Sequence, residues 1–331
     1  MAIAVVFPGQ GSQSVGMLSR LLDEEPAAAA ALAEADEALD FGLGALLREG
    51  PAELLDRTDL TQPAMLAAGV AAWRAWQARG GPMPVAMAGH SLGEYTALVC
   101  AGALGFGDAL RVVRARGEWM QQAVPEGEGA VAAILGLDDE AVASACRAAA
   151  AEGVVEAVNF NAPGQVVIAG HKAAVERAIE AARATGARRA LPLPVSVPVH
   201  CALMEPVAAK LAEALAGVAL RAPEVPVFHN IDATPRQAPD AIREALAQQV
   251  CRPVRWVECV RAMQRMGVDT LVEPGPGRVL SGLAKRIDRG LLALPVDDPD
   301  TLETALADLR AKQGANEDAG QDAKGDESGN A

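Results

Sequence analysis

A serine lies between two glycines in the stretch "VAMAGHSLGEYTALVC", which covers residues 85–100. The apolar run before Ser91 is typical of a strand, and the run after it has the apolar spacing of a helix. Gly89 and Gly93 let the chain turn tightly from strand to helix, so that the serine oxygen is exposed at the helix N-terminus. The pattern predicts a nucleophilic serine. The alternative is an ordinary glycine turn in which the serine caps the helix.

A nucleophilic serine needs a base that accepts its proton, and the chain has 4 histidines. His90 adjoins Ser91 in the chain, so its side chain should project elsewhere. His171 falls at a helix start, where capping or exposure explains it, and His229 ends a strand. His200, in "VSVPVHCALMEP", lies on the stretch expected to lead from one lobe back to the other. Its position favours His200 as the base.

Negative charge that develops on an attacked carbonyl needs backbone N–H groups to stabilise it. The N–H of Leu92, directly after the serine, is one candidate. The N-terminal "FPGQGSQ" resembles a dinucleotide fingerprint, but it lacks the third glycine, and no acidic residue follows at the end of a second strand. We therefore reject nucleotide binding. The glycine-rich loop around Gln10 could instead supply a second N–H and line the pocket.

The composition excludes several classes of protein. The chain has 331 residues and 51% hydrophobic residues, yet no apolar run is long enough to span a bilayer, so we expect a soluble cytoplasmic protein. A net charge of −14 disfavours nucleic-acid binding. The 5 cysteines are scattered and have no histidine partners at metal spacing, which indicates neither disulfides nor a metal site.

The order of helical and strand patterns predicts an α/β fold with two domains. Residues 1–128 and 199–312 alternate helices with short buried strands, which is typical of a parallel sheet. Residues 129–198 follow the order βαββαβ, which predicts a ferredoxin-like domain inserted in the larger one. Residues 313–331 have almost no apolar content, and we expect this acidic tail to be disordered.

Spaced motifs along the chain carry a family resemblance. In order, "FPGQGSQ", "TDLTQPA", "AGHSLGEYTAL", "RARGEWMQ", "AVNFNAPGQVVIAG", "VPVHCALM", "QQVCRPVRW" and "EPGPGRVLSGL" resemble malonyl-CoA:acyl carrier protein transacylase of fatty acid synthesis. The resemblance runs to about residue 310. It implies an α/β-hydrolase-like large domain with a ferredoxin-like insert. It also implies transfer of malonyl from coenzyme A to the phosphopantetheine thiol of acyl carrier protein through a malonyl-serine intermediate.

The resemblance also assigns roles to individual residues. It implies Ser91 as the acylated nucleophile, His200 as its base, the N–H groups of Gln10 and Leu92 as the oxyanion hole, the main-chain carbonyl of Gln249 as the group that orients the histidine, and Arg116 as the ligand of the substrate carboxylate.

Arg116 decides which acyl group the site should prefer. A guanidinium binds a carboxylate through two parallel hydrogen bonds, and an uncharged acyl group would leave it desolvated and unpaired. Malonyl is therefore expected over acetyl. Without the resemblance, Arg116 could equally be a surface arginine paired with Glu118 or Glu126.

The resemblance implies no cofactor, since the coenzyme A thioester is a substrate, and we expect a monomer. Acyl carrier protein is acidic, so it requires a local basic patch on this acidic chain. The candidates for this patch are Lys285, Arg286, Arg289, Arg188 and Arg189.

Three questions stay open at this stage. Val199 precedes His200 where the family often has a small polar residue, which leaves the tolerance of methylmalonyl undecided. The chief alternative function is a serine esterase or thioesterase, which would accept neutral esters and need an acidic triad member. Another is an acyltransferase of a polyketide or malonate-decarboxylase system.

Overall fold

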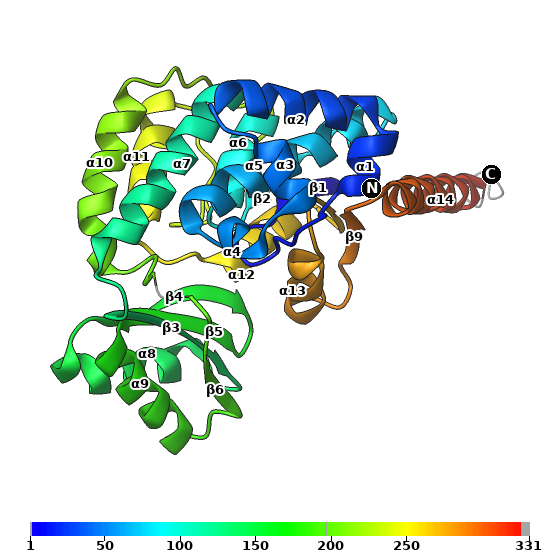
Figure 1. The fold of residues 1–331 in the computed structure, drawn as a ribbon. Helices are drawn as coiled ribbons and strands as arrows, with labels where there is room; N and C mark the ends of the chain where they lie inside the picture. Colours follow the sequence, from blue (N-terminus) through cyan, green and yellow to red (C-terminus); the bar gives the residue numbers. More distant parts are fainter. Residues whose placement is uncertain (1, 196, 326–331) are drawn as a thin grey trace.

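The large domain is built on a five-stranded sheet in which every described pairing is parallel, in the order β7-β2-β1-β8-β9. The computed structural model describes residues 2–195 and 197–325 (Figure 1). The strands of this sheet are β1 (Ile3–Phe7), β2 (Ala86–Gly89), β7 (Val227–Phe228), β8 (Thr270–Pro274) and β9 (Leu292–Val296). The chain runs from β1 to β2 on one side and later returns to β8 on the other, so the strand order reverses at β1. Ligands of open α/β sheets bind at the carboxyl ends of strands beside such a reversal.

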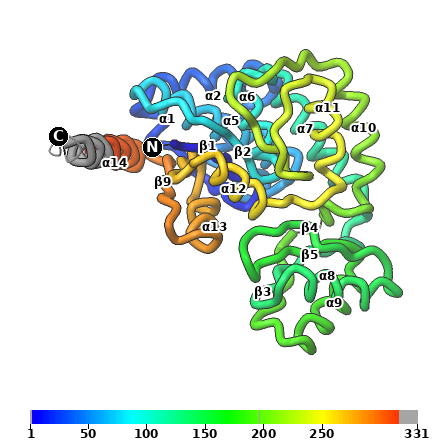
Figure 2. Tube along the Cα trace, turned by 180° about the vertical axis from the view of Figure 1, so that it is seen from behind, coloured from blue at the N-terminus to red at the C-terminus, as the bar shows by residue number. Residues whose placement is uncertain are grey.

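Helices cover both faces of this sheet because its strands are apolar on both sides. In β1, Val5 and Phe7 face one core cluster, while Ala4 and Val6 face the other. The helices before the insert are α1 (Ser19–Glu24), α2 (Pro26–Ala38), α3 (Leu43–Glu49), α4 (Ala52–Leu55), α5 (Thr58–Ala78), α6 (Gly93–Cys100) and α7 (Phe106–Ala123). Those after it are the 3₁₀ turn η2 (Ala202–Met204), α10 (Glu205–Ala216), α11 (Pro239–Gln249), α12 (Trp256–Arg265), α13 (Val279–Ile287) and α14 (Pro299–Gly325). Figure 2, from behind, shows α12 and α13 beside the insert.

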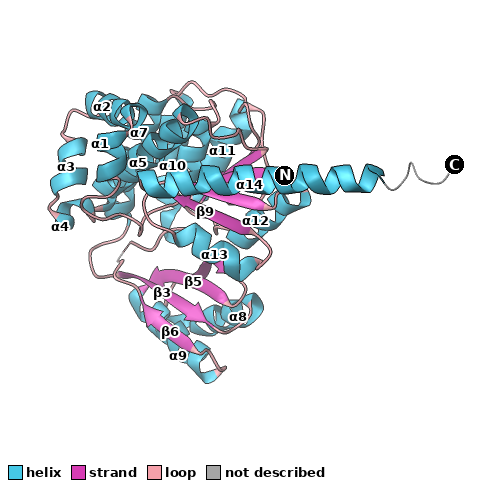
Figure 3. Cartoon of the chain, turned by 90° about the vertical axis from the view of Figure 1, so that its right-hand side faces the viewer, coloured by secondary structure: helices cyan, strands magenta, loops and turns pink. Residues whose placement is uncertain are grey.

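The insert has the predicted order βαββαβ and forms its own antiparallel sheet (Figure 3). Its elements are β3 (Gly129–Leu135), α8 (Asp139–Ala149), the 3₁₀ turn η1 (Ala150–Glu152), β4 (Val155–Ala162), β5 (Gln165–His171), α9 (Lys172–Ala184) and β6 (Arg189–Pro192). The strand order β4-β5-β3-β6 is that of a ferredoxin-like sheet. The predicted fold class is confirmed in both parts.

The strands of the insert alternate between two environments, as the two-residue period of a strand requires. Val166 and Ile168 of β5 pack with the side chains of α8 and α9. Val167 and Ala169, between and after them, belong to a cluster on the other face that includes Cys201 of the large domain. This second face of the insert therefore forms one side of the cleft between the domains.

Two details differ from the sequence prediction. The strand expected at "VPVFHN" is limited to Val227–Phe228. The segment expected to be disordered from Gln313 continues α14 to Gly325, while residues 326–331 lie outside the described residues. Three alanines in residues 313–325 favour a helix, whereas the three glycines of the same segment disfavour one. None of the described helices combines the length and apolar character that crossing a bilayer requires.

Candidate active site

Ser91 occupies the turn between β2 and α6, with a left-handed φ of 52°. The positions two residues before and two residues after Ser91 require glycine. A Cβ on Gly89 would overlap the backbone of Gly93, and a Cβ on Gly93 would overlap the backbone of Phe7. The two glycines therefore let α6 begin directly against the ends of β1 and β2, and the serine is held in a strained conformation at the corner.

Asn230, just after β7, holds this corner through its side-chain amide. Its Oδ1 accepts a hydrogen bond from the Ser91 N–H at 2.7 Å, and its Nδ2 donates to the Gly89 carbonyl at 2.7 Å. Asn230 is 0% exposed, so water does not compete for these bonds. One side chain thus fixes the backbone on both sides of His90.

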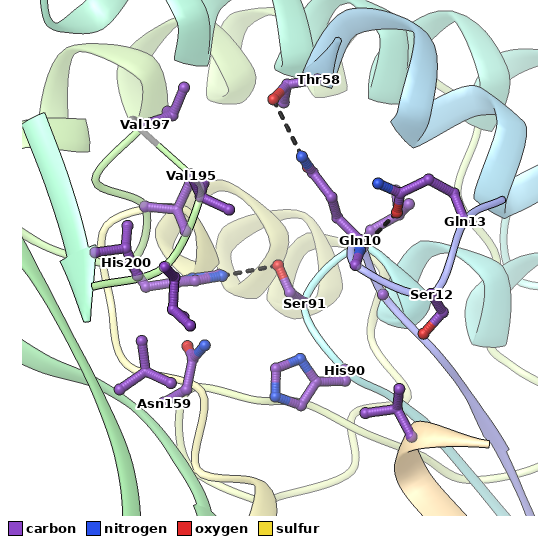
Figure 4. A pocket seen from close by; sticks show the side chains of 18 of the residues that line it. Gln10, Ser12, Gln13, Thr58, His90, Ser91, Asn159, Val195, Val197 and His200 are labelled. Carbon is purple, nitrogen blue, oxygen red and sulfur yellow. Dashed lines mark hydrogen bonds between the residues drawn. The ribbon is translucent and has the colours of Figure 1, made fainter. Parts of the chain in front are cut away.

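His200 lies directly against the serine (Figure 4). Its Nε2 is 2.7 Å from Ser91 Oγ, and its Nδ1 is 2.7 Å from the main-chain oxygen of Gln249. A carbonyl oxygen can only accept, so Nδ1 carries the proton and Nε2 is the free acceptor. This tautomer is the one that can take the proton of the serine hydroxyl.

The surroundings of His200 keep it neutral. Burial, and then the positive charge of Arg116, lower the pKa of His200 to about 3. The imidazole is therefore available as a base at neutral pH, before any substrate binds.

The other histidines do not reach the serine oxygen. His90 Nε2 pairs with Asn161 Oδ1 at 2.8 Å, and its ring packs against Trp256. His171 Nδ1 accepts a hydrogen bond from the backbone of the insert. His229 is buried and its Nδ1 lies 2.7 Å from Glu94 Oε1. The structure thus brings His200 and Ser91 together and leaves the remaining three apart.

Arg116, on α7, is buried beside the serine and 1% exposed. Its Nη1 donates to Gln62 Oε1 at 2.6 Å, and its Nη2 donates to Gln249 Oε1 at 3.2 Å and to Ser91 Oγ at 3.3 Å. The ring of Tyr95 lies 5.7 Å from its guanidinium carbon. Burial lowers the pKa of Arg116. The guanidinium therefore lies within reach of an acyl group on the serine.

Arg116 has no acidic partner among the described residues, and its Nε has no hydrogen-bond partner there. Glu118, one of the two surface partners considered from the sequence, pairs instead with Arg114 at 3.3 Å. A buried guanidinium without a carboxylate is costly, and it indicates an anionic group supplied by a ligand.

The two backbone N–H groups expected to form the oxyanion hole belong to neighbouring segments. Leu92 is the N-cap of α6, and Gln10 lies in the loop after β1, where a Cβ on Gly9 would come within 2.5 Å of the His90 carbonyl oxygen. Neither the Gln10 nor the Leu92 N–H donates a hydrogen bond to another described residue. The side chain of Gln10 is fixed separately, because its Nε2 donates to Thr58 Oγ1 at 3.2 Å (Figure 4).

Comparisons with known proteins agree with this geometry. The acyl transferase domain family matches residues 4–286. The chain is 56% identical over 303 residues to the malonyl CoA-acyl carrier protein transacylase of Salmonella typhimurium, which covers 92% of this chain and 98% of that protein. The corresponding protein of Bacillus subtilis is 46% identical and covers 93% and 97%.

The chain belongs to the malonyl CoA-acyl carrier protein transacylase family.

Solved structures of the family have the same fold. An acyl carrier protein S-malonyltransferase from Vibrio cholerae is 53% identical, with a TM-score of 0.90 over 92% of this chain and 100% of that chain. A malonyl-transacylase solved in complex with a type II polyketide acyl-carrier protein is 54% identical, with a TM-score of 0.91 over 93% and 100%. Membership in this family makes the chain an acyltransferase.

The transacylase site opens into a cavity of about 540 Å³ between the two domains. The large domain contributes polar groups to it, among them Ser91, Arg116 and His200. The insert and the stretch that returns from it contribute mainly apolar side chains, which are Val131, Val167, Leu193, Pro194, Val195, Val197 and Val199. Such a cavity combines a largely apolar lining with a smaller set of polar groups, as is typical of sites for small ligands.

Sequence reasoning did not find some of the polar residues around this site. Asn230 follows β7 and Glu94 lies in the first turn of α6, so both are at the carboxyl edge of the sheet. Their positions after buried strands were a usable signal. Gln62, inside α5, gave no signal because its partner Arg116 is 54 residues away. No cluster of metal-binding side chains occurs among the described residues.

Proposed function

We propose that the chain transfers a malonyl group from malonyl-CoA to the phosphopantetheine thiol of acyl carrier protein, through a malonyl ester on Ser91, in fatty acid synthesis. The observation that supports this most directly is the buried guanidinium of Arg116, 3.3 Å from Ser91 Oγ and without a carboxylate partner among the described residues. The free carboxylate of a malonyl group would supply the missing anion.

In the first half of the reaction, Ser91 Oγ attacks the thioester carbonyl while His200 Nε2 takes the hydroxyl proton. The N–H groups of Gln10 and Leu92 stabilise the oxyanion. The carbon–sulfur bond then breaks, and the coenzyme A thiolate leaves with the proton from His200. The malonyl carboxylate stays bound to Arg116.

In the second half, the carrier's thiol gives its proton to His200 and attacks the malonyl ester. The ester bond breaks, and Ser91 Oγ regains its proton from His200. Donor and acceptor are both thiols, so one set of groups serves both halves. The reaction needs no bound cofactor beyond these residues and the coenzyme A thioester.

The partner of His200 bears on the alternative of a serine esterase. A hydrolase of the usual triad type orients its histidine with an acidic side chain. Here Nδ1 of His200 is hydrogen-bonded to a main-chain carbonyl, and the nearby acid Glu94 binds His229 instead. Because one structural neighbour was solved with a polyketide acyl-carrier protein, polyketide synthesis is a second candidate for the pathway that supplies the carrier.

The acyl carrier protein would approach the cleft from the side of α13. Lys285 and Arg286 lie in the last turn of α13, whose first residues line the cavity. Arg286 Nη1 donates to Gln165 Oε1 of the insert at 2.5 Å, so these charges lie where the two domains meet. Arg189 begins β6 of the insert and is exposed. These positions support docking of an acidic partner across the cleft.

A single chain supplies the nucleophile, the base and the guanidinium, which supports our proposal that the protein acts as a monomer. We also propose a cytoplasmic location, because coenzyme A thioesters are its substrates.

Intact-mass spectrometry after mixing with malonyl-CoA, acetyl-CoA or methylmalonyl-CoA tests the proposed reaction. We expect a malonyl adduct on Ser91, little acetyl adduct, and no adduct on Ser91→Ala. Release of free malonate without transfer to carrier thiol would indicate a thioesterase. An adduct that persists in Ser91→Ala would exclude the mechanism.

A further inference from the structure

Glu94 is a buried carboxylate next to the site that does not line the cavity. It lies three residues after Ser91, in the first turn of α6, and is 0% exposed. Its Oε1 is 2.7 Å from His229 Nδ1, and its Oε2 accepts from the Asn230 N–H at 2.8 Å and from Gln249 Nε2 at 2.9 Å. Such a carboxylate, fully desolvated and bonded on both oxygens, fixes the groups around it.

The first group that Glu94 fixes is Asn230, which holds the turn at Ser91. The side chain of Asn230 bonds to the Ser91 N–H and to the Gly89 carbonyl, while its own backbone N–H is bonded to Glu94. If the carboxylate moves, Asn230 moves with it. The direction of Ser91 Oγ therefore depends on Glu94, although the two side chains do not touch.

The second group is Gln249, which is hydrogen-bonded to His200, Arg116 and Ser91. Its main-chain oxygen accepts from His200, its Oε1 accepts from Arg116, and its Nε2 donates to the Ser91 carbonyl at 2.9 Å. The same Nε2 donates to Glu94. A neutral amide therefore lies between the only two buried charges that meet here within the described residues, Glu94 and Arg116.

This arrangement resolves an electrostatic conflict. A carboxylate bonded directly to Arg116 would occupy the guanidinium and compete with the substrate. With no negative charge nearby, the empty site would contain an uncompensated buried cation. Burial lowers the pKa of Arg116, while Tyr95 and then Glu94 raise it. Glu94 acts from one amide away, so it favours the charged form without binding the guanidinium.

We propose that Glu94 is a positioning residue for acyl transfer: through Asn230 and Gln249 its carboxylate aligns Ser91 with His200, and it keeps Arg116 free for the substrate carboxylate. This inference rests on the proposed function for its substrate, but its alignment part can be tested without malonyl-CoA.

The test compares Glu94→Gln with wild type. A glutamine removes the negative charge and presents one acceptor where the carboxylate presented two, and its NH₂ can pair with His229 Nδ1 only if that imidazole changes tautomer. Displacement of reacting groups by about 1 Å costs on the order of 10²-fold, so we expect Ser91 acylation per active site to fall by roughly that factor. The malonyl-CoA concentration for half-saturation should change much less. Glu94→Asp, which keeps the charge, should recover part of the rate.

The control is Glu25→Gln. Glu25 is also buried, at 6% exposed, and pairs with Arg79 at 2.6 Å, but it lies far along the chain from the site residues. We expect this variant to lose stability and to keep the wild-type rate per active site. The active fraction is counted from the mass adduct at completion, which separates misfolded protein from slow chemistry.

A second readout uses a neutral fluorophosphonate that labels activated serines. Its reaction with Ser91 needs the alignment of serine and base but no substrate carboxylate, so Glu94→Gln should slow it and the control Glu25→Gln should not. If wild type reacts with this probe but forms no malonyl adduct, the proposed substrate is wrong while the alignment inference is still measured.

Equal rates per active site in Glu94→Gln and wild type, with either reagent, would overturn the inference. If Glu94→Gln does not fold, Gln249→Met breaks the same link from its other end while keeping the main-chain carbonyl. It should then slow acylation by a similar factor, and a wild-type rate in Gln249→Met would also reject the inference.

Discussion

The two walls of the active-site cavity are built in opposite ways. On the large-domain wall, Ser91, His200 and Arg116 each make hydrogen bonds of 2.6 to 3.3 Å to other residues of that domain. On the insert wall, Val131 and Val167 offer only apolar contacts.

The asparagines of β4 are the exception on the insert wall, and they behave differently from each other. Asn161 binds His90, whereas Asn159 Oδ1 has no partner among the described residues.

This difference indicates that the large-domain wall carries the reacting groups. Groups that react must be held within fractions of an ångström, and dense hydrogen bonding on helices and strand ends achieves this. A wall that only excludes water and limits the size of the acyl group needs shape and apolar surface. Substitutions on the large-domain wall should therefore cost orders of magnitude in rate, and those on the insert wall should mainly change which acyl groups are accepted.

The largest effect is expected from Arg116→Ala. Loss of two charged hydrogen bonds, at ~1.5 to 3 kcal/mol each, should reduce malonyl transfer by roughly 10³-fold. Acetyl transfer should change little, so the ratio of the malonyl rate to the acetyl rate measures how much the guanidinium contributes to the preference for malonyl. Arg114→Ala is the matched control, because Arg114 lies on the same helix and pairs at the surface with Glu118. Equal losses for both acyl groups would show that Arg116 only supports the fold.

The second prediction concerns pH. His200 has a pKa of about 3, so serine acylation should be nearly constant from about pH 8 to about pH 5 and decline only below that range. Arg116 is one cause of the low pKa, so Arg116→Ala should move the decline to higher pH. Rapid-quench measurements of the adduct would show both. A wild-type decline centred near pH 6.5, the ordinary histidine value, would contradict the buried, cation-facing base.

The same pKa links pH to stability. The folded-state pKa of His200 is lowered, so the unfolded chain takes up this proton first as the pH falls. The contribution of this group to stability is complete above about pH 6.5 and is lost progressively toward about pH 3. Urea unfolding of wild type and His200→Gln across this range measures it, and parallel curves would deny the contribution.

A smaller effect is expected where the carrier docks. Changing Lys285 and Arg286 to Glu should raise the KM for acyl carrier protein by about 10-fold at low salt, because steering by surface charge is reversed. The KM for malonyl-CoA should stay at the wild-type value. The double change of Lys172 and Arg177 to Glu, on α9 behind the insert sheet, is the control for the same change of net charge. A similar rise in the control would remove the case for a local patch.

The smallest effect on malonyl transfer is expected from Val199→Ser. Val199 lines the cavity beside His200, and a smaller polar side chain there should leave the malonyl rate within about 3-fold. The methylmalonyl-to-malonyl ratio is the informative readout, with Val85→Ser at the surface as control. A loss as large as that of Arg116→Ala would break the contrast between the two walls.

How far the sequence could predict the site depended on sequence distance. The turn at Ser91 could be predicted because Gly89, Ser91 and Gly93 are close together in the chain and determine its local backbone. Gln249 was reached only through the family resemblance, since an orienting main-chain carbonyl leaves no trace in side-chain type. Strand β9 and the helices α1 to α4 were not predicted individually, because short apolar segments there have no distinctive period.

The sequence by itself determined the alternation of elements, the inserted βαββαβ unit and the glycine-flanked serine, because each is set by residues close together in the chain. Only the tertiary structure decided that Ser91 meets His200 across 109 residues and that Glu94 reaches Gln249 across 155. It also decided that Arg116 is buried rather than at the surface. These outcomes depend on how separate helices and strand ends pack around one sheet edge, and no local pattern of side chains encodes that packing.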